Sequence, residues 1–212
     1  MKMLDYQAAT DFLANLDTDW AQLIATVGPC TFQTKLTREP YEALMRAVAY
    51  QQLHAKAADA ILGRLLSLYD QQFPSPQQLL ATDFETLRTC GFSAKKIESL
   101  YGVAAAALTG LVPSRVDAER MTDDALIAQL VTLKGIGRWT VEMMLMFTLA
   151  RTDVLPADDL GVAEGYKRLK KLTSPPKPKK IREIGELWSP YRSIATWYLW
   201  RVPKVAIAQV AD

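Results

Sequence analysis

The stretch Leu133–Thr140, with the sequence LKGIGRWT, constrains the fold of this chain more than any other. Apolar side chains at helical spacing predict a helix before it that ends at Lys134: Leu126, Ile127, Leu130 and Leu133, behind a capping Thr122. Gly135 and Gly137 allow the backbone two positive φ angles, while Ile136 between them fills the core beneath a tight turn. A second helix is predicted to begin directly after the glycines. The backbone N–H groups and helix dipole that meet at such a hairpin predict an anion site, for example for a phosphate oxygen.

Helix signals continue along the rest of the chain, and no segment alternates apolar and polar residues for long enough to predict a strand. Residues 5–28 have the periodicity of one amphipathic helix or a pair of helices. Pro40 opens a further helix in its first turn, and Thr82 with Glu85 has the spacing of a capping box. We therefore predict an all-α protein.

The composition excludes several classes of protein. The chain has 212 residues, two cysteines and a single histidine. Cys30 and Cys90 cannot supply the four thiolates of an iron–sulfur cluster, and one histidine gives no zinc site. No run of about eighteen apolar residues predicts a membrane span, and the first residues lack the apolar stretch of a secretory signal. We expect free thiols in a reducing compartment, the cytoplasm of a bacterium or the nucleus of a eukaryote.

Basic residues gather in two places, although the formal net charge of +2 neither favours nor excludes a nucleic-acid partner. Lys95 and Lys96 follow Ser93 in the first turn of a predicted helix, where the helix dipole disfavours cations. An external anion or simple solvation would each explain them. Residues 166–180 carry seven basic residues and no acidic one, and we predict an exposed, partly polyproline-like and mobile segment. It would either add affinity for phosphates or serve as a solubilising loop.

An acidic pair follows the hairpin by about twenty residues, at the start of a predicted helix that runs towards Tyr166. Asp158 and Asp159 can cap that helix through their side chains. One of them can equally be a reactive carboxylate, and the pattern alone leaves both interpretations open.

Four segments together resemble one family of proteins: Leu133–Thr140, Tyr50–Ala58 (YQQLHAKAA), Leu155–Val162 (LPADDLGV), and Pro190–Ser193 (PYRS) running on to Trp200. They resemble the helix-hairpin-helix DNA glycosylases, in particular the 3-methyladenine DNA glycosylase II or alkylpurine branch. The resemblance spans roughly residues 38 to 202. It implies two helical subdomains with an active-site cleft between them. Residues 38–152 would hold the helix-hairpin-helix motif at about 126–149, and residues 1–37 with 153–212 would carry the catalytic aspartate.

The resemblance assigns the catalytic carboxylate to Asp159, while Asp158 either supports that carboxylate or has a structural role. Removal of a base passes through a transition state with oxocarbenium character on the sugar, which a carboxylate stabilises while it positions or deprotonates a water. Bifunctional relatives carry a lysine directly after the Gly-x-Gly-x segment, and here that residue is Trp139. The resemblance therefore implies a monofunctional glycosylase that leaves an abasic site.

The resemblance also assigns residues that contact the base and the DNA. The base pocket would be lined by two indoles and two aliphatic side chains, the latter at positions where some relatives carry aromatic residues: Trp139, Trp200, Met143 and Leu160. Gln52 would be the wedge that fills the gap left by the flipped base, with His54 near the minor groove. The hairpin contact with the DNA backbone would involve Lys134, Gly135, Ile136, Gly137 and Arg138. The hairpin carbonyls are also suited to hold a monovalent cation.

The resemblance thus implies an enzyme that flips alkylated purines of the 3-methyladenine and 7-methylguanine type out of double-stranded DNA and hydrolyses their N-glycosidic bond. It implies no cofactor and no structural metal. We expect a monomer with no membrane association and no obligate protein partner. A non-catalytic helix-hairpin-helix module that binds distorted DNA is the alternative, but such a module needs neither Asp159 nor the indoles of Trp139 and Trp200. An iron–sulfur or Schiff-base lyase is opposed by the missing cysteines and the missing lysine.

Overall fold

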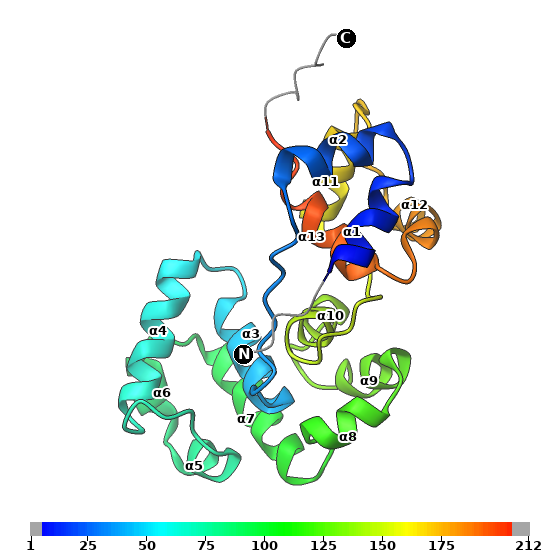
Figure 1. Cartoon of the computed structure of the whole chain (residues 1–212). Helices are drawn as coiled ribbons and strands as arrows, with labels where there is room; N and C mark the ends of the chain where they lie inside the picture. Colours follow the sequence, from blue (N-terminus) through cyan, green and yellow to red (C-terminus); the bar gives the residue numbers. More distant parts are fainter. Residues whose placement is uncertain (1–5, 205–212) are drawn as a thin grey trace. The chain divides into compact units, whose positions relative to one another are not determined.

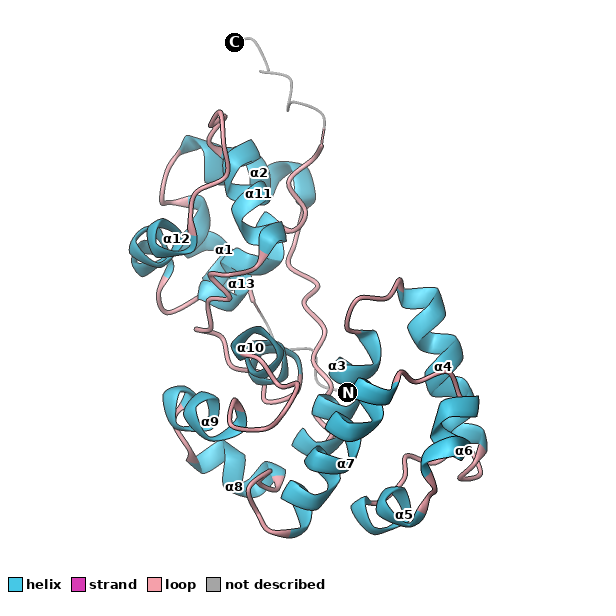
Figure 2. Ribbon diagram, turned by 180° about the vertical axis from the view of Figure 1, so that it is seen from behind, coloured by secondary structure: helices cyan, strands magenta, loops and turns pink. Residues whose placement is uncertain are grey.

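The computed structural model describes residues 6–204, and every regular element within this range is a helix (Figure 1, Figure 2). The prediction of an all-α fold is therefore confirmed. The chain divides into two compact units, a terminal unit of Met1–Thr34 with Ala150–Asp212 and a central unit of Lys35–Leu149. The resemblance had implied boundaries at residues 38 and 152.

The terminal unit is built around one buried helix. Its elements are α1 (Gln7–Ala14), α2 (Thr18–Val27), α11 (Leu160–Leu169), α12 (Pro178–Gly185), the 3₁₀ turn η1 (Glu186–Trp188) and α13 (Arg192–Leu199). All side chains of α13 from Ser193 to Leu199 are buried, and α1, α2 and α11 pack against it. Trp20 of α2 meets Trp188 edge to face, with ring centroids 5.7 Å apart. This geometry suits two indoles in one core.

The central unit is organised by its longest helix, α7 (Ala94–Leu108), which packs against α3, α5 and α6. The other elements are α3 (Pro40–Tyr50), α4 (Ala55–Ser67), α5 (Pro76–Ala81), α6 (Phe84–Thr89), α8 (Arg115–Arg120), α9 (Asp123–Leu130) and α10 (Arg138–Phe147). α10 packs against both α3 and α9. The core contains Leu44, Val48, Leu100, Leu130 and Leu145, each at most 1% exposed.

The two ends of the central unit are tied to each other. The backbone N–H of Lys35 donates to the carbonyl of Phe147 over 2.7 Å. The guanidinium Nη2 of Arg115 donates to the carbonyls of Arg38 (2.9 Å) and Thr148 (2.5 Å). These bonds fasten the segment that enters the unit to the segment that leaves it, and so hold residues 35–149 together as one body.

Seven of the thirteen α-helices in residues 6–204 begin after a residue whose side chain accepts a hydrogen bond from a backbone N–H of the first turn. Thr122 accepts a hydrogen bond from Ala125 N (3.2 Å) at the start of α9, as predicted. The capping box predicted at Thr82 was wrong, because Asp83 caps α6 by accepting from Thr86 N over 2.8 Å. Ser75 forms a true capping box with Gln78 at the start of α5.

The prediction of an exposed, partly polyproline-like segment over residues 166–180 holds for the exposure of residues 171–174 and 177–180, but both ends of the segment are helical. α11 continues to Leu169, which is buried, and Pro178 is the first residue of α12. Proline is favoured at this position because the first N–H groups of a helix have no intrahelical acceptor. Lys170 lies between the two and binds the carboxylates of Asp17 and Asp19, each over 2.7 Å. The start of the segment is therefore fastened to α2 and its N-cap.

Candidate active site

The hairpin between α9 and α10 needs a glycine at one of its two glycine positions. Gly135 has a φ of +82°, and a Cβ atom there would overlap the side chain of Ser99 in α7. Gly137 has a φ of −93° and open space around it, so the expectation of two positive φ angles holds only at Gly135. Ile136 is 4% exposed and fills the core as predicted. α9 ends at Leu130, four residues earlier than expected, because a turn precedes the hairpin.

The start of α10 has the features of an anion site. Gly137 is its N-cap, and no side chain caps the helix. The first turn of a helix presents N–H groups without intrahelical acceptors, together with the positive end of the dipole. These groups belong to the hairpin segment predicted to contact a phosphate.

The basic side chains of the hairpin are ion-paired within the central unit. Lys134 Nζ lies 2.6 Å from Glu98 Oε2, and Arg138 Nε lies 2.9 Å from Glu142 Oε1. The Lys134 pair is exposed and contributes little to stability, so this lysine can exchange its partner for a phosphate at small cost. Glu142 is only 3% exposed at its side chain, which fixes Arg138 more firmly. Contact of either residue with DNA stays a prediction.

The loop between α3 and α4 holds the predicted wedge. Gln52 is exposed and has a φ of +55°, an unusual conformation for a residue other than glycine. His54 is exposed as the N-cap residue of α4 and makes no side-chain capping bond. The side-chain amide of Gln51 donates to the carbonyl of Gly135 over 2.9 Å. The wedge loop and the hairpin, more than eighty residues apart, are thus in direct contact.

An external anion is not needed to explain Lys96. Its ammonium donates to the carbonyl of Ala49 over 2.8 Å, at the end of α3. A cation is favourable there because the last carbonyls of a helix carry partial negative charge. Burial lowers the pKa of Lys96 below its ordinary value. Lys95, next to it, is exposed.

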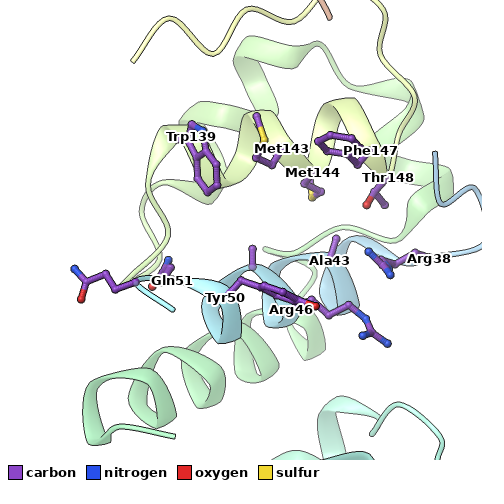
Figure 3. A pocket seen from close by; sticks show the side chains of 12 residues that line it. Arg38, Ala43, Arg46, Tyr50, Gln51, Trp139, Met143, Met144, Phe147 and Thr148 are labelled. Carbon is purple, nitrogen blue, oxygen red and sulfur yellow. The ribbon is translucent and has the colours of Figure 1, made fainter. Parts of the chain in front are cut away.

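A cavity of about 750 Å³ lies between α3 and α10 (Figure 3). Trp139 and Met143, both predicted to bind the base, lie together on the α10 side. The cavity is lined by Arg38, Ala43, Arg46, Ala47, Tyr50, Gln51, Gln52, Trp139, Met143, Met144, Phe147 and Thr148. Trp139 is 43% exposed, whereas tryptophan side chains are highly buried on average. The size is within the range of small-molecule sites.

The α3 side of the cavity carries residues that sequence reasoning missed. Arg38 and Arg46 line the cavity there, and both bind the carboxylate of Glu42, whose Oε1 lies 3.5 Å from Arg38 Nε and 2.6 Å from Arg46 Nε. The hydroxyl of Tyr50 donates a hydrogen bond to the carboxylate of Asp59 in α4. This hydrogen bond, together with burial, raises the pKa of Tyr50. The helical spacing of residues 38, 42, 46 and 50 was the available signal.

Asp159 occupies the N-cap of α11 in the terminal unit. Its Oδ1 accepts hydrogen bonds from Val162 N and from the indole Nε1 of Trp200, each 2.9 Å long. The structure therefore brings together two of the residues assigned to the site, the carboxylate and one indole. Leu160 directly after it is 73% exposed.

Two glycines of α11 allow this arrangement. A Cβ on Gly161 would lie 2.8 Å from Cδ1 of Trp200 and 2.9 Å from Oδ1 of Asp159. A Cβ on Gly165 would overlap the backbone carbonyl of Leu199 in α13. The spacing of four residues places both glycines on one face of α11. The absence of side chains there lets α11 approach the end of α13 closely.

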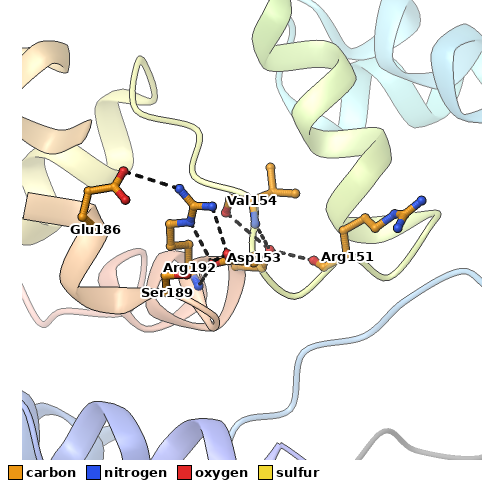
Figure 4. Close-up of polar contacts among 7 residues, drawn as sticks. Arg151, Asp153, Val154, Glu186, Ser189 and Arg192 are labelled. Atoms are coloured by element: carbon orange, nitrogen blue, oxygen red, sulfur yellow. Dashed lines mark hydrogen bonds and ion pairs between the residues drawn. The ribbon is translucent and has the colours of Figure 1, made fainter. Parts of the chain in front are cut away.

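The residues around the acidic pair hold its segment in place. Asp158 Oδ2 lies 2.8 Å from Arg182 Nη2 in α12, consistent with a structural role. Farther upstream, Asp153 accepts from Arg192 Nε (2.8 Å), Arg192 Nη2 (2.9 Å) and Ser189 Oγ (2.9 Å) (Figure 4). Burial acts to raise the pKa of Asp153, but these hydrogen bonds outweigh it and the net pKa is lowered.

Ser193 completes this attachment. Its hydroxyl accepts from Val154 N over 3.0 Å and donates to the carbonyl of Arg151 over 2.7 Å (Figure 4). The segment that leads to Asp159 is thus fixed to the first turn of α13, while Asp159 itself contacts Trp200 just beyond the last turn. Sequence reasoning missed this double attachment, although PYRS was among the quoted segments.

Residues 6–204 contain neither a potential metal site nor a helix that could cross a membrane. No three side chains of His, Cys, Asp or Glu gather as a potential metal site. No helix combines the length and apolar character required to cross a bilayer. The Gly135 carbonyl, one of those suited to a monovalent cation, accepts from Gln51, and the cation stays a prediction.

The description "HhH-GPD superfamily base excision DNA repair protein" belongs to the family model that matches residues 45–190. The match covers more than half of the chain, and the protein therefore belongs to this family. It is 46% identical over 196 residues to DNA-3-methyladenine glycosylase 1 of Schizosaccharomyces pombe, covering 92% of this chain and 86% of that protein. An alkylbase DNA glycosidase-like protein of the same yeast is 38% identical over 203 residues, 95% of each chain.

A solved structure resembles the fold just described. It is a 3-methyladenine DNA glycosylase of Schizosaccharomyces pombe in complex with abasic DNA. The TM-score is 0.86 at 45% sequence identity, and the similarity covers 94% of this chain and 98% of that one. The family expected from the quoted segments is confirmed.

Proposed function

We propose that this protein is a monofunctional DNA glycosylase that flips alkylated purines out of duplex DNA and hydrolyses their N-glycosidic bond. One observation carries the proposal: Asp159 caps α11 and is held by the indole N–H of Trp200. A carboxylate fixed from two sides is pre-organised, and so it needs little rearrangement when positive charge develops on a sugar.

The reaction follows from these groups. As the bond from C1′ to the purine nitrogen breaks, its electron pair leaves with the base, and the deoxyribose gains oxocarbenium character. The carboxylate of Asp159 stabilises that charge. Water adds to C1′ and gives a proton to the carboxylate, leaving an abasic site. Trp139 offers no amine, so no Schiff base forms and the strand stays intact.

The two indoles would recognise the base. An alkylated purine that carries positive charge is attracted to an electron-rich ring by roughly 0.5–2 kcal/mol per well-placed contact. The exposed face of Trp139, beside Met143, supports a role in stacking. Trp200 would present its ring while its N–H stays on Asp159. Leu160, largely exposed next to Asp159, supports an aliphatic contact.

DNA would be held through the backbone of the hairpin and opened by the wedge loop. The uncapped start of α10 suits a phosphate oxygen, with Lys134 and Arg138 at its sides. Gln52, which is exposed and has a positive φ, suits the space left by a flipped base, with His54 in the same loop. We expect a monomer that needs no protein partner and works where the genome lies, in a bacterial cytoplasm or a nucleus.

Product analysis tests this function. Duplex DNA treated with a methylating agent is incubated with the protein, the released bases are identified by mass spectrometry, and the strands are sized before and after alkali. We expect free methylpurines, strand breaks only after alkali, and no covalent protein–DNA adduct when borohydride is added to reduce a Schiff base. Strand breaks without alkali, or a protein–DNA adduct trapped by borohydride, would show that the reaction is that of a lyase and not hydrolysis alone.

A non-catalytic DNA-binding module is the second candidate, because one relative is named only as glycosidase-like. The same experiment separates the two. Binding to methylated duplex without release of any base would support the module and end the enzyme proposal.

A further inference from the structure

The wedge loop and the hairpin, which the proposed function assigns to two different contacts with DNA, meet through one side chain. Gln51 Nε2 donates to the carbonyl of Gly135 over 2.9 Å. We propose that Gln51 is a positioning residue that keeps the wedge loop in register with the hairpin, so that phosphate binding and base flipping occur together. This inference rests on the proposed function.

The conformation of the wedge loop requires support. Gln51 leaves the helical conformation at the end of α3 with a ψ of 127°, and Gln52 then adopts a φ of +55°. A left-handed conformation is unfavourable for a residue other than glycine, and it persists only where its surroundings enforce it. The bond from the Gln51 side chain to a distant backbone carbonyl is one such restraint.

The N-terminal half of α7 supports both loops from below. Lys96 donates to the carbonyl of Ala49, two residues before Gln51. Ser99 lies against Gly135 so closely that a Cβ would not fit, and Glu98 binds Lys134 of the hairpin. The two loops are therefore held by neighbouring turns of one helix, and Gln51 joins them directly.

The contacts that join the wedge loop and the hairpin fix the distance between the wedge and the group that binds the phosphate. The distance between a backbone phosphate and the base step beside it is set by the nucleic acid, so a wedge must stand at a fixed distance from the group that grips the phosphate. A loosened wedge loop would still leave the hairpin able to bind phosphates. Loss of Gln51 should therefore impair flipping while affinity for undamaged duplex remains.

The experiment compares Gln51→Leu, which keeps the size of the side chain but loses the donor, with Gln77→Leu, an exposed glutamine of α5. The probe is a duplex with one alkylated purine beside 2-aminopurine, whose fluorescence rises when its neighbour unstacks. Fluorescence, single-turnover base release and affinity for undamaged duplex are measured on each protein. For Gln51→Leu we expect flipping and base release to fall about tenfold, the effect of one lost hydrogen bond of ordinary strength, with affinity within about twofold. Gln77→Leu should match the wild type.

A second pair of variants tests the support from α7. Lys96→Met removes the bond to Ala49, while Lys95→Met changes the exposed neighbour. We expect Lys96→Met to reduce flipping as Gln51→Leu does, and Lys95→Met to leave it unchanged. Wild-type flipping in Gln51→Leu would overturn the proposal. A Gln51→Leu protein whose flipping and duplex affinity fall by the same factor, and whose melting temperature also falls, would overturn it too, because that pattern marks a purely structural role. If the wild type unstacks the probe but releases no base, the proposed function fails while the fluorescence still decides the role of Gln51.

Discussion

The indole N–H of Trp200 donates a 2.9 Å hydrogen bond to Oδ1 of Asp159, which lies 41 residues earlier in the chain. The same oxygen accepts from the backbone of Val162 in the first turn of α11. The direction of the carboxylate therefore depends on how closely α11 approaches the end of α13. Substitutions that change this approach should alter catalysis before they alter the fold.

Trp200→Phe keeps an aromatic ring but removes the N–H that holds Asp159. Hydrogen bonds to charged groups contribute about 1.5–3 kcal/mol, so we expect single-turnover base release to slow by roughly 10–100-fold. Trp197→Phe is the control, because Trp197 is buried and its ring lies against the guanidinium of Arg201. Equal rates for Trp200→Phe and the wild type would show that the indole N–H does not position the carboxylate.

Gly161→Ala and Gly165→Ala should have different effects although they lie on one face of α11. The new methyl of Gly161→Ala meets side chains, Trp200 and Asp159, and we expect a loss of activity with a small change in melting temperature. Gly165→Ala meets the backbone of Leu199, and the forced shift should cost about 1–3 kcal/mol of unfolding free energy. Gly102→Ala in α7, with open space around it, should be stabilising by about 0.5–1 kcal/mol. Urea unfolding and base release on the three variants check this order.

Local signals could be read from the sequence, whereas long-range contacts could not. Thr122 caps its helix as expected because a cap involves only the following turn. The need for Gly135 depends on Ser99 in another helix, and the role of Lys96 depends on the end of α3. The basic segment 166–180 was misjudged because the acidic partners of Lys170 lie about 150 residues away.

The candidate site shows the same difference between what local patterns predict and what long-range contacts decide. The roles of Asp159, Trp139 and Trp200 came from resemblance, whereas the anion site of the hairpin was predicted from its glycines and backbone N–H groups. The pattern of the acidic pair alone left capping and catalysis equally open. The bond between Asp159 and Trp200 is a tertiary contact that no periodicity encodes. The attachment of Asp153 to Arg192 and the contact of Gln51 with Gly135 were missed for the same reason.

The hairpin glycines offer a matched pair. Gly135→Ala places a methyl against Ser99 at a positive φ, so we expect lower stability and at least a tenfold loss of duplex affinity. Gly137→Ala has an ordinary φ and open space, and it should change stability by no more than about 1 kcal/mol. Melting temperatures and fluorescence anisotropy with a labelled duplex measure both effects. Equal tolerance at the two positions would contradict the geometry of the turn.

Acid should weaken the attachment between Asp153 and Arg192. The pKa of Asp153 in the folded protein is lowered below the ordinary value of 3.8, mainly by its hydrogen bonds with Arg192 and Ser189. Its contribution to stability is therefore present above that value and is lost as the pH falls through the folded-state pKa. We expect the difference in unfolding free energy between the wild type and Asp153→Asn to be largest near neutral pH and to shrink towards pH ~3. Urea titrations across this range, with Asp124→Asn as an exposed control, measure it; a difference that grows in acid would reverse the assigned sign.

The most direct measurement compares Asp159→Asn with Asp158→Asn. Each variant replaces a carboxylate by an amide, at one of two adjacent positions. Single-turnover release of an alkylated purine from a defined duplex is followed, together with affinity for that duplex. We predict that Asp159→Asn binds like the wild type but releases base at least 10²-fold more slowly, since it removes electrostatic stabilisation of the transition state. Asp158→Asn, which loses only its bond to Arg182, should stay within about tenfold of the wild type. Release by Asp159→Asn at the wild-type rate, or a larger loss in Asp158→Asn, would contradict the assignment of Asp159 as the catalytic carboxylate.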